Sequence, residues 1–264
     1  MNTPLTPNQL QVSPTDLERA AQIQHNLLPR EPLQNEWLDI AAHTAQRDAV
    51  GGDIHTFQTL PNGRVRVFVA DVAGKGVAAA LVATLCQAHL RHLQPEATDP
   101  ADLLRKLNAA MQGEFSPVRY LTAICAEFDP ATGTVTLARA GHELPLYYHP
   151  ASANLPAGLE KIETEGLGIG LAPPDSFDDM LTQSTLPFPS GTALLFFTDG
   201  IVEATNRSGD EFGSEHLEAL FAESAATGAN ADTVNQIILS AVDAFAESAP
   251  RHDDRTLVCM LAKA

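Results

Sequence analysis

The sequence contains few of the residues that define several common protein classes. It has three cysteines in 264 residues, Cys86, Cys125 and Cys259, and each lies in an apolar stretch. Three scattered cysteines are too few for a disulfide framework or a cysteine-based zinc site. They therefore indicate buried thiols in a reducing compartment, which favours a cytoplasmic protein.

Basic residues and long apolar runs are also scarce. Lys and Arg number 16 against 33 Asp and Glu, which gives a formal charge of -17. Nucleic acids and anionic membranes bind proteins largely through basic side chains, so neither is an expected partner. The most apolar run, residues 77–88, is too short to span a bilayer, and the first 11 residues do not resemble a secretory signal. The acidity indicates a soluble surface, or carboxylates gathered to hold cations.

Apolar residues make up 44% of the chain, which is enough for a substantial core. Residues 1–14 are polar and contain several prolines, which predicts a disordered leader. Residues 15–30 then read as a short linker or regulatory helix that stops at Pro29. Because no repeat or change of composition follows, we expect one domain over residues 31–264.

Hydrophobic periodicity predicts a mixture of strands and helices. Residues 150–190 are rich in proline and glycine, which predicts loops with short strands. Strands come in runs with paired helices between them, so the sequence predicts an α+β fold of antiparallel sheets flanked by helices. The expected strands are residues 37–45, 64–70, 120–128, 134–140, 192–198 and 256–262, and the expected helices are 15–28, 77–93, 100–111, 214–224 and 232–248.

Four aspartate sites stand out because each lies where a strand pattern begins or ends, mostly beside glycine. A carboxylate at a strand end projects from a rigid edge, and a neighbouring glycine lets the backbone approach a ligand closely. The sites are Asp53 in Val50-Gly-Gly-Asp53, Asp71 in Ala70-Asp-Val-Ala-Gly-Lys-Gly76, Asp199 in Phe197-Thr-Asp-Gly200, and the pair Asp253-Asp254.

Oxygen ligands of this kind suit hard cations such as Mg²⁺ or Mn²⁺. A pair of such ions activates water and holds a phosphoryl oxygen, which is the chemistry of phosphomonoester hydrolysis. Taken singly, an aspartate beside a glycine is also ordinary turn chemistry. The spacing alone leaves open whether the four sites converge.

An ordered series of short motifs runs through roughly residues 18–262. The motifs are Ala21-Gln-Ile-Gln24 with Leu27-Leu-Pro29, Val50-Gly-Gly-Asp53, Asp71-Val-Ala-Gly-Lys-Gly76 with Ala79-Ala80, Phe128-Asp-Pro with Gly133, Ala140-Gly-His142 with Pro145, Gly168-Ile-Gly170, Phe197-Thr-Asp-Gly-Ile-Val-Glu-Ala204 with Asn206, Phe212-Gly213 and Asp253-Asp-Arg-Thr256. In this order they resemble the SpoIIE/RsbU branch of the PPM (PP2C-like) metal-dependent protein-serine/threonine phosphatases.

The resemblance implies a PP2C-like sandwich of two antiparallel β-sheets flanked by helices, with two Mn²⁺ or Mg²⁺ ions at one end. It implies no side-chain nucleophile, because a metal-bound water attacks phosphorus. In the implied site, Asp71 bridges both ions beside the Val72 carbonyl, Asp53 binds the first ion, Asp199 and Asp253 bind the second, and Asp254, Lys75, Gly52 and Gly200 lie around the ligands or the substrate.

The implied activity is removal of phosphate from a serine or threonine of a signalling protein, of the anti-sigma-factor antagonist type found in partner-switching pathways. The helix at residues 15–30 resembles the segment that joins a sensor or dimerising element to the catalytic domain. A regulatory partner or a homodimer through that helix is therefore expected. Two other functions stay open, which are a degenerate phosphatase fold acting as a binding scaffold and a metal hydrolase of a small phosphometabolite.

The chain departs from the family pattern at two positions. Thr56 stands where relatives often have a second aspartate, and Lys75 stands where many have histidine. Lys75 is either a contact for substrate phosphate or a solvated loop lysine. We expect His142 to be a structural residue at a strand end and Arg47 to be a surface residue.

Overall fold

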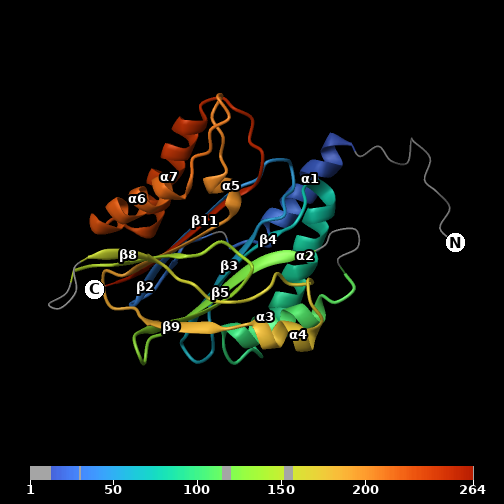
Figure 1. The fold of residues 1–264 in the computed structure, drawn as a ribbon. Coiled ribbons are helices and arrows are strands. Elements are labelled where there is room, and N and C mark those ends of the chain that lie inside the picture. Colours follow the sequence, from blue (N-terminus) through green and yellow to red (C-terminus); the bar gives the residue numbers. More distant parts are fainter. Residues whose placement is uncertain (1–12, 30, 115–119, 152–156, 264) are drawn as a thin grey trace.

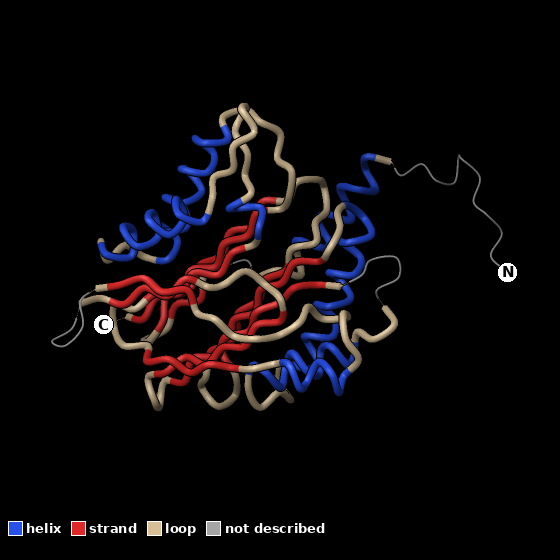
Figure 2. The backbone as a smooth tube through the Cα atoms, viewed as in Figure 1, coloured by secondary structure: helices blue, strands red, loops and turns tan. Residues whose placement is uncertain are grey.

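The computed structural model describes residues 13–29, 31–114, 120–151 and 157–263, whose strands form two antiparallel sheets (Figures 1 and 2). The strands are β1 (Leu33–Gln34), β2 (Leu38–Ala45), β3 (Ile54–Thr59), β4 (Val65–Val72), β5 (Leu121–Asp129), β6 (Thr134–Ala140), β7 (Leu146–His149), β8 (Gly158–Lys161), β9 (Gln183–Pro187), β10 (Ala193–Phe197) and β11 (Arg255–Ala262). In the described part, one sheet has the order β1-β2-β11-β10-β7-β8 and the other has β3-β4-β5-β6-β9.

Helices cover the outer face of each sheet (Figure 1). The helices of the described residues are α1 (Pro14–His25), α2 (Gly76–Leu93), α3 (Pro100–Ala110), α4 (Pro174–Met180), α5 (Asp199–Val202), α6 (Ser214–Ala226) and α7 (Ala231–Ala246), of which α1 belongs to neither covering layer. Helices α2, α3 and α4 share an apolar core with the five-stranded sheet, and α5, α6 and α7 share one with the six-stranded sheet. A third core fills the space between the sheets. The predicted α+β sandwich is confirmed.

Strand β4 shows how side-chain alternation builds these layers. Val65, Val67 and Val69 point into the core between the sheets, whereas Phe68 and Ala70 point toward α2 and α3. Successive side chains of a strand face opposite ways, so one strand contributes to two cores. Because both faces are covered, β4 is apolar at most positions, and Asp71 is its penultimate residue.

The structure also contains elements that periodicity does not predict. Hydrophobic periodicity does not predict strand β3 or helix α5. Helix α4 lies within residues 150–190, where loops and short strands were expected. Helix α4 has seven residues, of which Phe177 is buried, so it is too short to display a helical repeat.

The N-terminal boundary differs slightly from the sequence prediction. Ser13 caps α1 by accepting a hydrogen bond from the Asp16 amide, and Pro14 is the first helical residue. The rest of the predicted leader, residues 1–12, lies outside the described residues. None of the helices within the described ranges is long and apolar enough to cross a bilayer.

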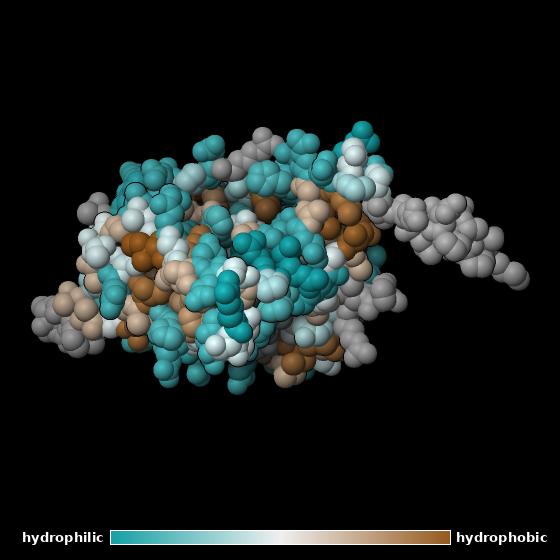
Figure 3. Space-filling model, turned by 90° about the horizontal axis from the view of Figure 1, so that it is seen from above, coloured by the Kyte–Doolittle hydropathy of each residue, from teal (hydrophilic) through white to brown (hydrophobic). Residues whose placement is uncertain are grey.

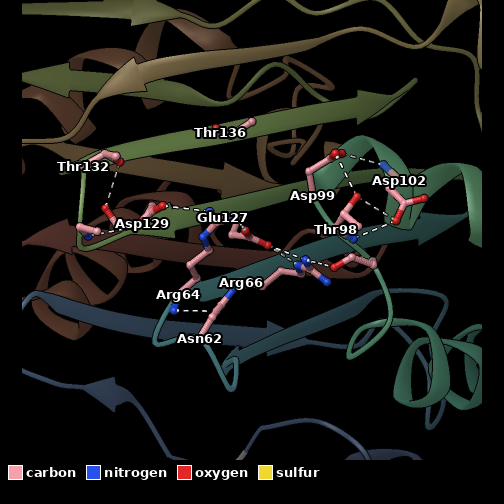
Figure 4. A network of polar contacts seen from close by, with 12 residues as sticks. Asn62, Arg64, Arg66, Thr98, Asp99, Asp102, Glu127, Asp129, Thr132 and Thr136 are labelled. Carbon is pink, nitrogen blue, oxygen red and sulfur yellow. Dashed lines mark hydrogen bonds and ion pairs between the residues drawn. The ribbon is translucent and has the colours of Figure 1, made fainter.

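A buried ion pair joins the five-stranded sheet to the end of α2 (Figure 4). Arg66 on β4 is 1% exposed and donates from Nε to Glu127 Oε2 on β5 over 2.9 Å. Its other nitrogens donate to the backbone carbonyls of Gln94 and Ala97, which follow α2. The arginine thereby satisfies the carbonyl of Gln94, which caps α2, and that of Ala97 in the segment that follows.

Replacing Arg66 by methionine is expected to destabilise the protein by about 3 kcal/mol, because Glu127 and the two carbonyls lose a buried partner. Arg64→Met is the matched control, since Arg64 lies on the same side of Glu127 but is far more exposed. It should cost about 1 kcal/mol or less. Urea unfolding measures the free energy of unfolding of both variants. Equal losses in the two variants would contradict the view that burial makes the Arg66 ion pair the more important one.

Candidate active site

The aspartates predicted as metal ligands lie at the same end of the sandwich, on segments of both sheets. Asp53 directly precedes β3, and Asp71 is the penultimate residue of β4 in the five-stranded sheet. Asp199 follows β10 and opens α5, and Asp253 lies just before β11 in the six-stranded sheet. Residues separated widely in the sequence are therefore brought together where the two sheets meet.

A pocket of about 270 Å³ opens between these segments. The carboxylates of Asp71, Asp199 and Asp253 line it, together with Glu143 and Lys75. The rest of its wall consists of Val72, Ala73, Gly74, Tyr120, Thr122, Gly141 and His142. Seen from the side on which α5 and its neighbouring loops lie, hydrophilic side chains gather near the middle of the molecule (Figure 3).

Asp53 is buried beside this pocket and is held by two hydroxyl groups. Its Oδ2 atom accepts hydrogen bonds from Thr198 Oγ1 at 2.8 Å and from Thr256 Oγ1 at 2.7 Å. Thr198 is the residue between β10 and α5, and Thr256 lies in β11. These bonds therefore tie the loop before β3 to the opposite sheet and fix the orientation of the carboxylate.

Asp254 faces the backbone of the loop that carries Asp53. Its Oδ1 atom accepts from the Arg47 amide and its Oδ2 atom from the Gly52 amide, each at 2.7 Å. A side chain at Gly51 would overlap the Asp254 carboxylate, and one at Gly200 would overlap the Asp254 carbonyl. At Gly200 the obstacle is backbone, which cannot move aside, and at Gly51 it is the Asp254 carboxylate that binds the neighbouring Gly52 amide.

Two residues that depart from the family pattern have definite partners. Lys75 forms an ion pair with Asp253 and donates to the His252 carbonyl at 2.7 Å. Thr56 accepts a hydrogen bond at 3.0 Å from Gln94, the residue that caps α2. Lys75 thus belongs to the pocket wall, whereas the Thr56 hydroxyl is engaged at the end of α2.

His142 is buried in the pocket wall after β6. Its Nδ1 atom lies 2.9 Å from Thr122 Oγ1 on β5. Burial lowers the pKa of His142 to about 3, so the imidazole is neutral and carries no charge to attract a phosphate. The expectation that His142 is structural agrees with this contact.

The carboxylates of the site raise the pKa values of one another. Burial, and then the neighbouring carboxylates of Asp53 and Asp199, raise the pKa of Asp71 to about 9. Burial also raises the pKa of Asp53 to about 7, although the Thr256 and Thr198 hydroxyls oppose the rise. Burial and Asp253 raise the pKa of Asp199. A bound cation would relieve this repulsion, and the all-oxygen donor set suits Mg²⁺ or Mn²⁺.

Within the described residues, no three His, Cys, Asp or Glu side chains form a ready-made group around one ion. A magnesium ion is usually held by one or two carboxylates and keeps several waters. The oxygen donors that line the pocket, Asp71, Asp199 and Asp253, are of the kind such an ion takes.

Sequence reasoning missed residues that support the site without being carboxylates. The Thr198 and Thr256 hydroxyls fix Asp53, and Glu143 on the pocket wall adds a further carboxylate, whose pKa is raised by desolvation and by Asp199. Each threonine lies within a recognised aspartate motif at a strand end. A search for hydroxyl groups beside the aspartates would have found both.

Comparison with known proteins shows the family of the chain. Residues 61–263 match the family model described as Stage II sporulation protein E (SpoIIE). The chain belongs to this family. The resemblance to the SpoIIE/RsbU branch, which rested on motifs, is therefore confirmed.

Two Bacillus subtilis proteins are related to the SpoIIE-family chain in sequence. Phosphoserine phosphatase RsbU is 27% identical over 195 residues, which cover 74% of this chain and 56% of RsbU. Phosphoserine phosphatase RsbP is 26% identical, and the match covers 72% of this chain and 46% of RsbP. The chain thus matches about half the length of these curated relatives.

Solved structures support the fold of this family member. The SiaA-PP2C domain of Pseudomonas aeruginosa has a TM-score of 0.77 at 21% identity, and the match covers 94% of this chain and 96% of that domain. RsbX in complex with magnesium has a TM-score of 0.62 at 14% identity, and the match covers 88% and 99% of the two chains.

Asp71→Asn is expected to stabilise the protein when divalent cations are removed, and more at about pH 8 than at about pH 5. The pKa of Asp71 is about 9 in the folded protein against an ordinary value of 3.8. Between these values the folded state binds more protons than the unfolded chain, so the free energy of unfolding falls as pH rises. Asparagine removes that dependence.

Thermal unfolding in a chelator at the two pH values measures the effect. The variant should exceed the wild type in Tm at the higher pH by several degrees, and the gap should narrow at the lower pH. A gap that is constant or widens toward low pH would show that repulsion at Asp71 does not limit stability.

Proposed function

We propose that the protein is a Mg²⁺- or Mn²⁺-dependent protein-serine/threonine phosphatase. The observation that carries the proposal is the pocket where carboxylates from both sheets meet, Asp71 from one and Asp199 and Asp253 from the other. Family membership over residues 61–263 supports the same activity. The pocket is polar and open to solvent, as access by a phosphorylated side chain of another protein requires.

In this proposal the chain holds two ions. Asp71, with the Val72 carbonyl beside it, would help to hold both ions, Asp53 would hold the first, and Asp199 and Asp253 would hold the second. The convergence of these residues, and the mutual rise in the pKa values of Asp53, Asp71 and Asp199, support the assignment. When bound, the ions supply Lewis-acid activation of a water for attack on phosphorus and neutralise phosphoryl charge.

The protein's own groups position this chemistry. Thr198 and Thr256 orient Asp53, while Asp254 fixes the Gly52 amide next to it. Lys75 holds Asp253 and adds a positive charge to the pocket wall, where it can attract a phosphate oxygen. Without cations the pocket would repel a phosphate dianion, since three aspartates and Glu143 line it.

We further propose that the substrate is a phosphoserine or phosphothreonine of a signalling protein of the anti-sigma-factor antagonist type. The names of RsbU and RsbP as phosphoserine phosphatases support phosphoserine as the group acted on. Control would come through α1, by a regulatory partner or a homodimer, and Ile23 on α1 is 62% exposed. Three buried free thiols support action in the cytoplasm.

The activity test is hydrolysis of a phosphoserine peptide and of an aryl phosphate with and without Mn²⁺. Asp71→Asn should lower the Mn²⁺-dependent rate by about 100-fold or more, because a ligand of both ions loses its charge. Asp175→Asn, on the exposed surface of α4, is the matched control and should retain the wild-type rate.

If wild type and Asp71→Asn show the same rate with Mn²⁺, the enzyme proposal fails. A protein without metal-dependent hydrolysis and without measurable Mn²⁺ binding would instead fit a binding scaffold. Faster hydrolysis of phosphorylated metabolites than of phosphoproteins would replace the proposed substrate class with small molecules.

A further inference from the structure

Lys75 is the only lysine or arginine among the described residues that line the pocket, and two glycines flank it. Gly74 and Gly76 have φ angles of 117° and 72°, which glycine adopts without strain. Lys75 directly precedes α2, at the position where a side chain that accepts a hydrogen bond usually caps a helix. A lysine ammonium cannot accept such a bond, and the Lys75 side chain makes no capping contact. Helix capping therefore does not explain a lysine at this position.

The Lys75 ammonium is bound instead to the segment before β11. Its Nζ atom donates to the His252 carbonyl at 2.7 Å and forms an ion pair with Asp253 Oδ2. The other oxygen of this carboxylate, Oδ1, accepts from the Asp254 amide at 3.0 Å. Both oxygens of Asp253 therefore have partners inside the protein. The side chains of Lys75 and Asp253 are 44% and 28% exposed, so their contact can open without disturbing an apolar core.

The charge of Lys75 acts on both carboxylates that are proposed to hold the second ion. Burial and then Asp253 raise the pKa of Asp199, and the Gly200 amide and Lys75 oppose that rise. An ion held by Asp199 and Asp253 would place a second positive charge beside the ammonium. Like charges at a partly buried site repel each other more strongly than in water. The lysine and the second ion therefore compete for Asp253.

We propose that Lys75 is a positioning residue that occupies Asp253 in place of the second divalent cation and leaves it when a substrate phosphate enters the pocket. The second cation and the phosphate then bind cooperatively, since each favours the state in which the ammonium has left Asp253. The first cation is less affected, because Asp53 is held by Thr198 and Thr256 and not by the lysine. This inference rests on the proposed metal-dependent function.

The test compares Lys75→Met with Lys106→Met in the full chain. Methionine is also unbranched and flexible, but it carries no charge. Lys106 is the matched control, because its ammonium likewise binds an aspartate, Asp102, and a backbone carbonyl, that of Glu96, but on α3 and away from the pocket. A third variant, Lys75→Arg, keeps the positive charge and should resemble the wild type.

Mn²⁺ binding is measured by calorimetry, with and without phenylphosphonate, which resembles an aryl phosphate but cannot be hydrolysed in the same way. Without phenylphosphonate, Lys75→Met should bind the second Mn²⁺ about tenfold more tightly than wild type, because a like charge is removed. Phenylphosphonate should tighten the second site in both proteins, but about fivefold more in the wild type, which alone has a lysine to release. Lys106→Met should match the wild type in every titration.

Thermal unfolding in a chelator supplies a second readout. Lys75→Met should have a Tm a few degrees below that of the wild type, because Asp253 loses its cationic partner. The same substitution is thus expected to weaken the metal-free protein and to strengthen the second metal site. A lysine that only met solvent would change neither quantity, and one that only bound phosphate would leave the Tm unchanged.

The outcomes separate this inference from the proposed function. If Lys75→Met binds the second Mn²⁺ no more tightly than the wild type, or if both proteins bind a single Mn²⁺, the lysine does not compete and the inference is wrong. If phenylphosphonate tightens the second site equally in both, the ammonium does not pass to the phosphate, and the proposed cooperativity is wrong. If the wild type binds no Mn²⁺ at all, the proposed function fails, and this inference fails with it.

Discussion

The constraint on which the rest of the structure depends is the gathering of like-charged carboxylates where two sheets meet. Burial and mutual repulsion raise the pKa values of Asp53 and Asp71 well above the ordinary range of aspartate. Such an arrangement opposes folding unless protons or cations offset it. A stack of three apolar cores supplies the rigid frame that holds the carboxylates together.

The hydrogen bonds around the site join the two halves of this frame. Asp53 belongs to the loop before β3, yet its partners Thr198 and Thr256 belong to the opposite sheet. Asp254, which directly precedes β11, likewise accepts a hydrogen bond from the Gly52 amide in the loop before β3. The polar bonds therefore do more than orient one carboxylate, because they also fix how the ends of the two sheets lie relative to each other. The same hydrogen bonds therefore determine both the position of the proposed metal ligands and the packing of the two sheets at this end.

Glycine makes the close approach of these segments feasible. A side chain at Gly51 or Gly200 would collide with Asp254. Both glycines lie within aspartate motifs that were picked out from the sequence, and each makes room for a distant residue, the Asp254 carboxylate at Gly51 and the Asp254 carbonyl at Gly200. The Gln24 amide then occupies the open side of the Gly51 peptide. Helix α1 is thereby joined to the loop that carries Asp53 through the Gly51 peptide.

The sequence by itself determined the strands with strong alternation and the long amphipathic helices, since these signals depend on residues near one another along the chain. Residues 64–70 and 77–93 correspond closely to β4 and α2. Short elements such as α4, and β3 beside the aspartate motif, gave no such signal and form because their neighbours pack against them.

The aspartate motifs were likewise visible in the sequence, as was their order along the chain. Only the tertiary structure decided that Asp71, Asp199 and Asp253 face one pocket, that Thr198 and Thr256 hold Asp53, and that Gln24 holds Gly51. These contacts join residues that lie far apart in the chain. No local pattern encodes them, because they follow from the pairing of β10 and β11 and from the stacking of one sheet on the other.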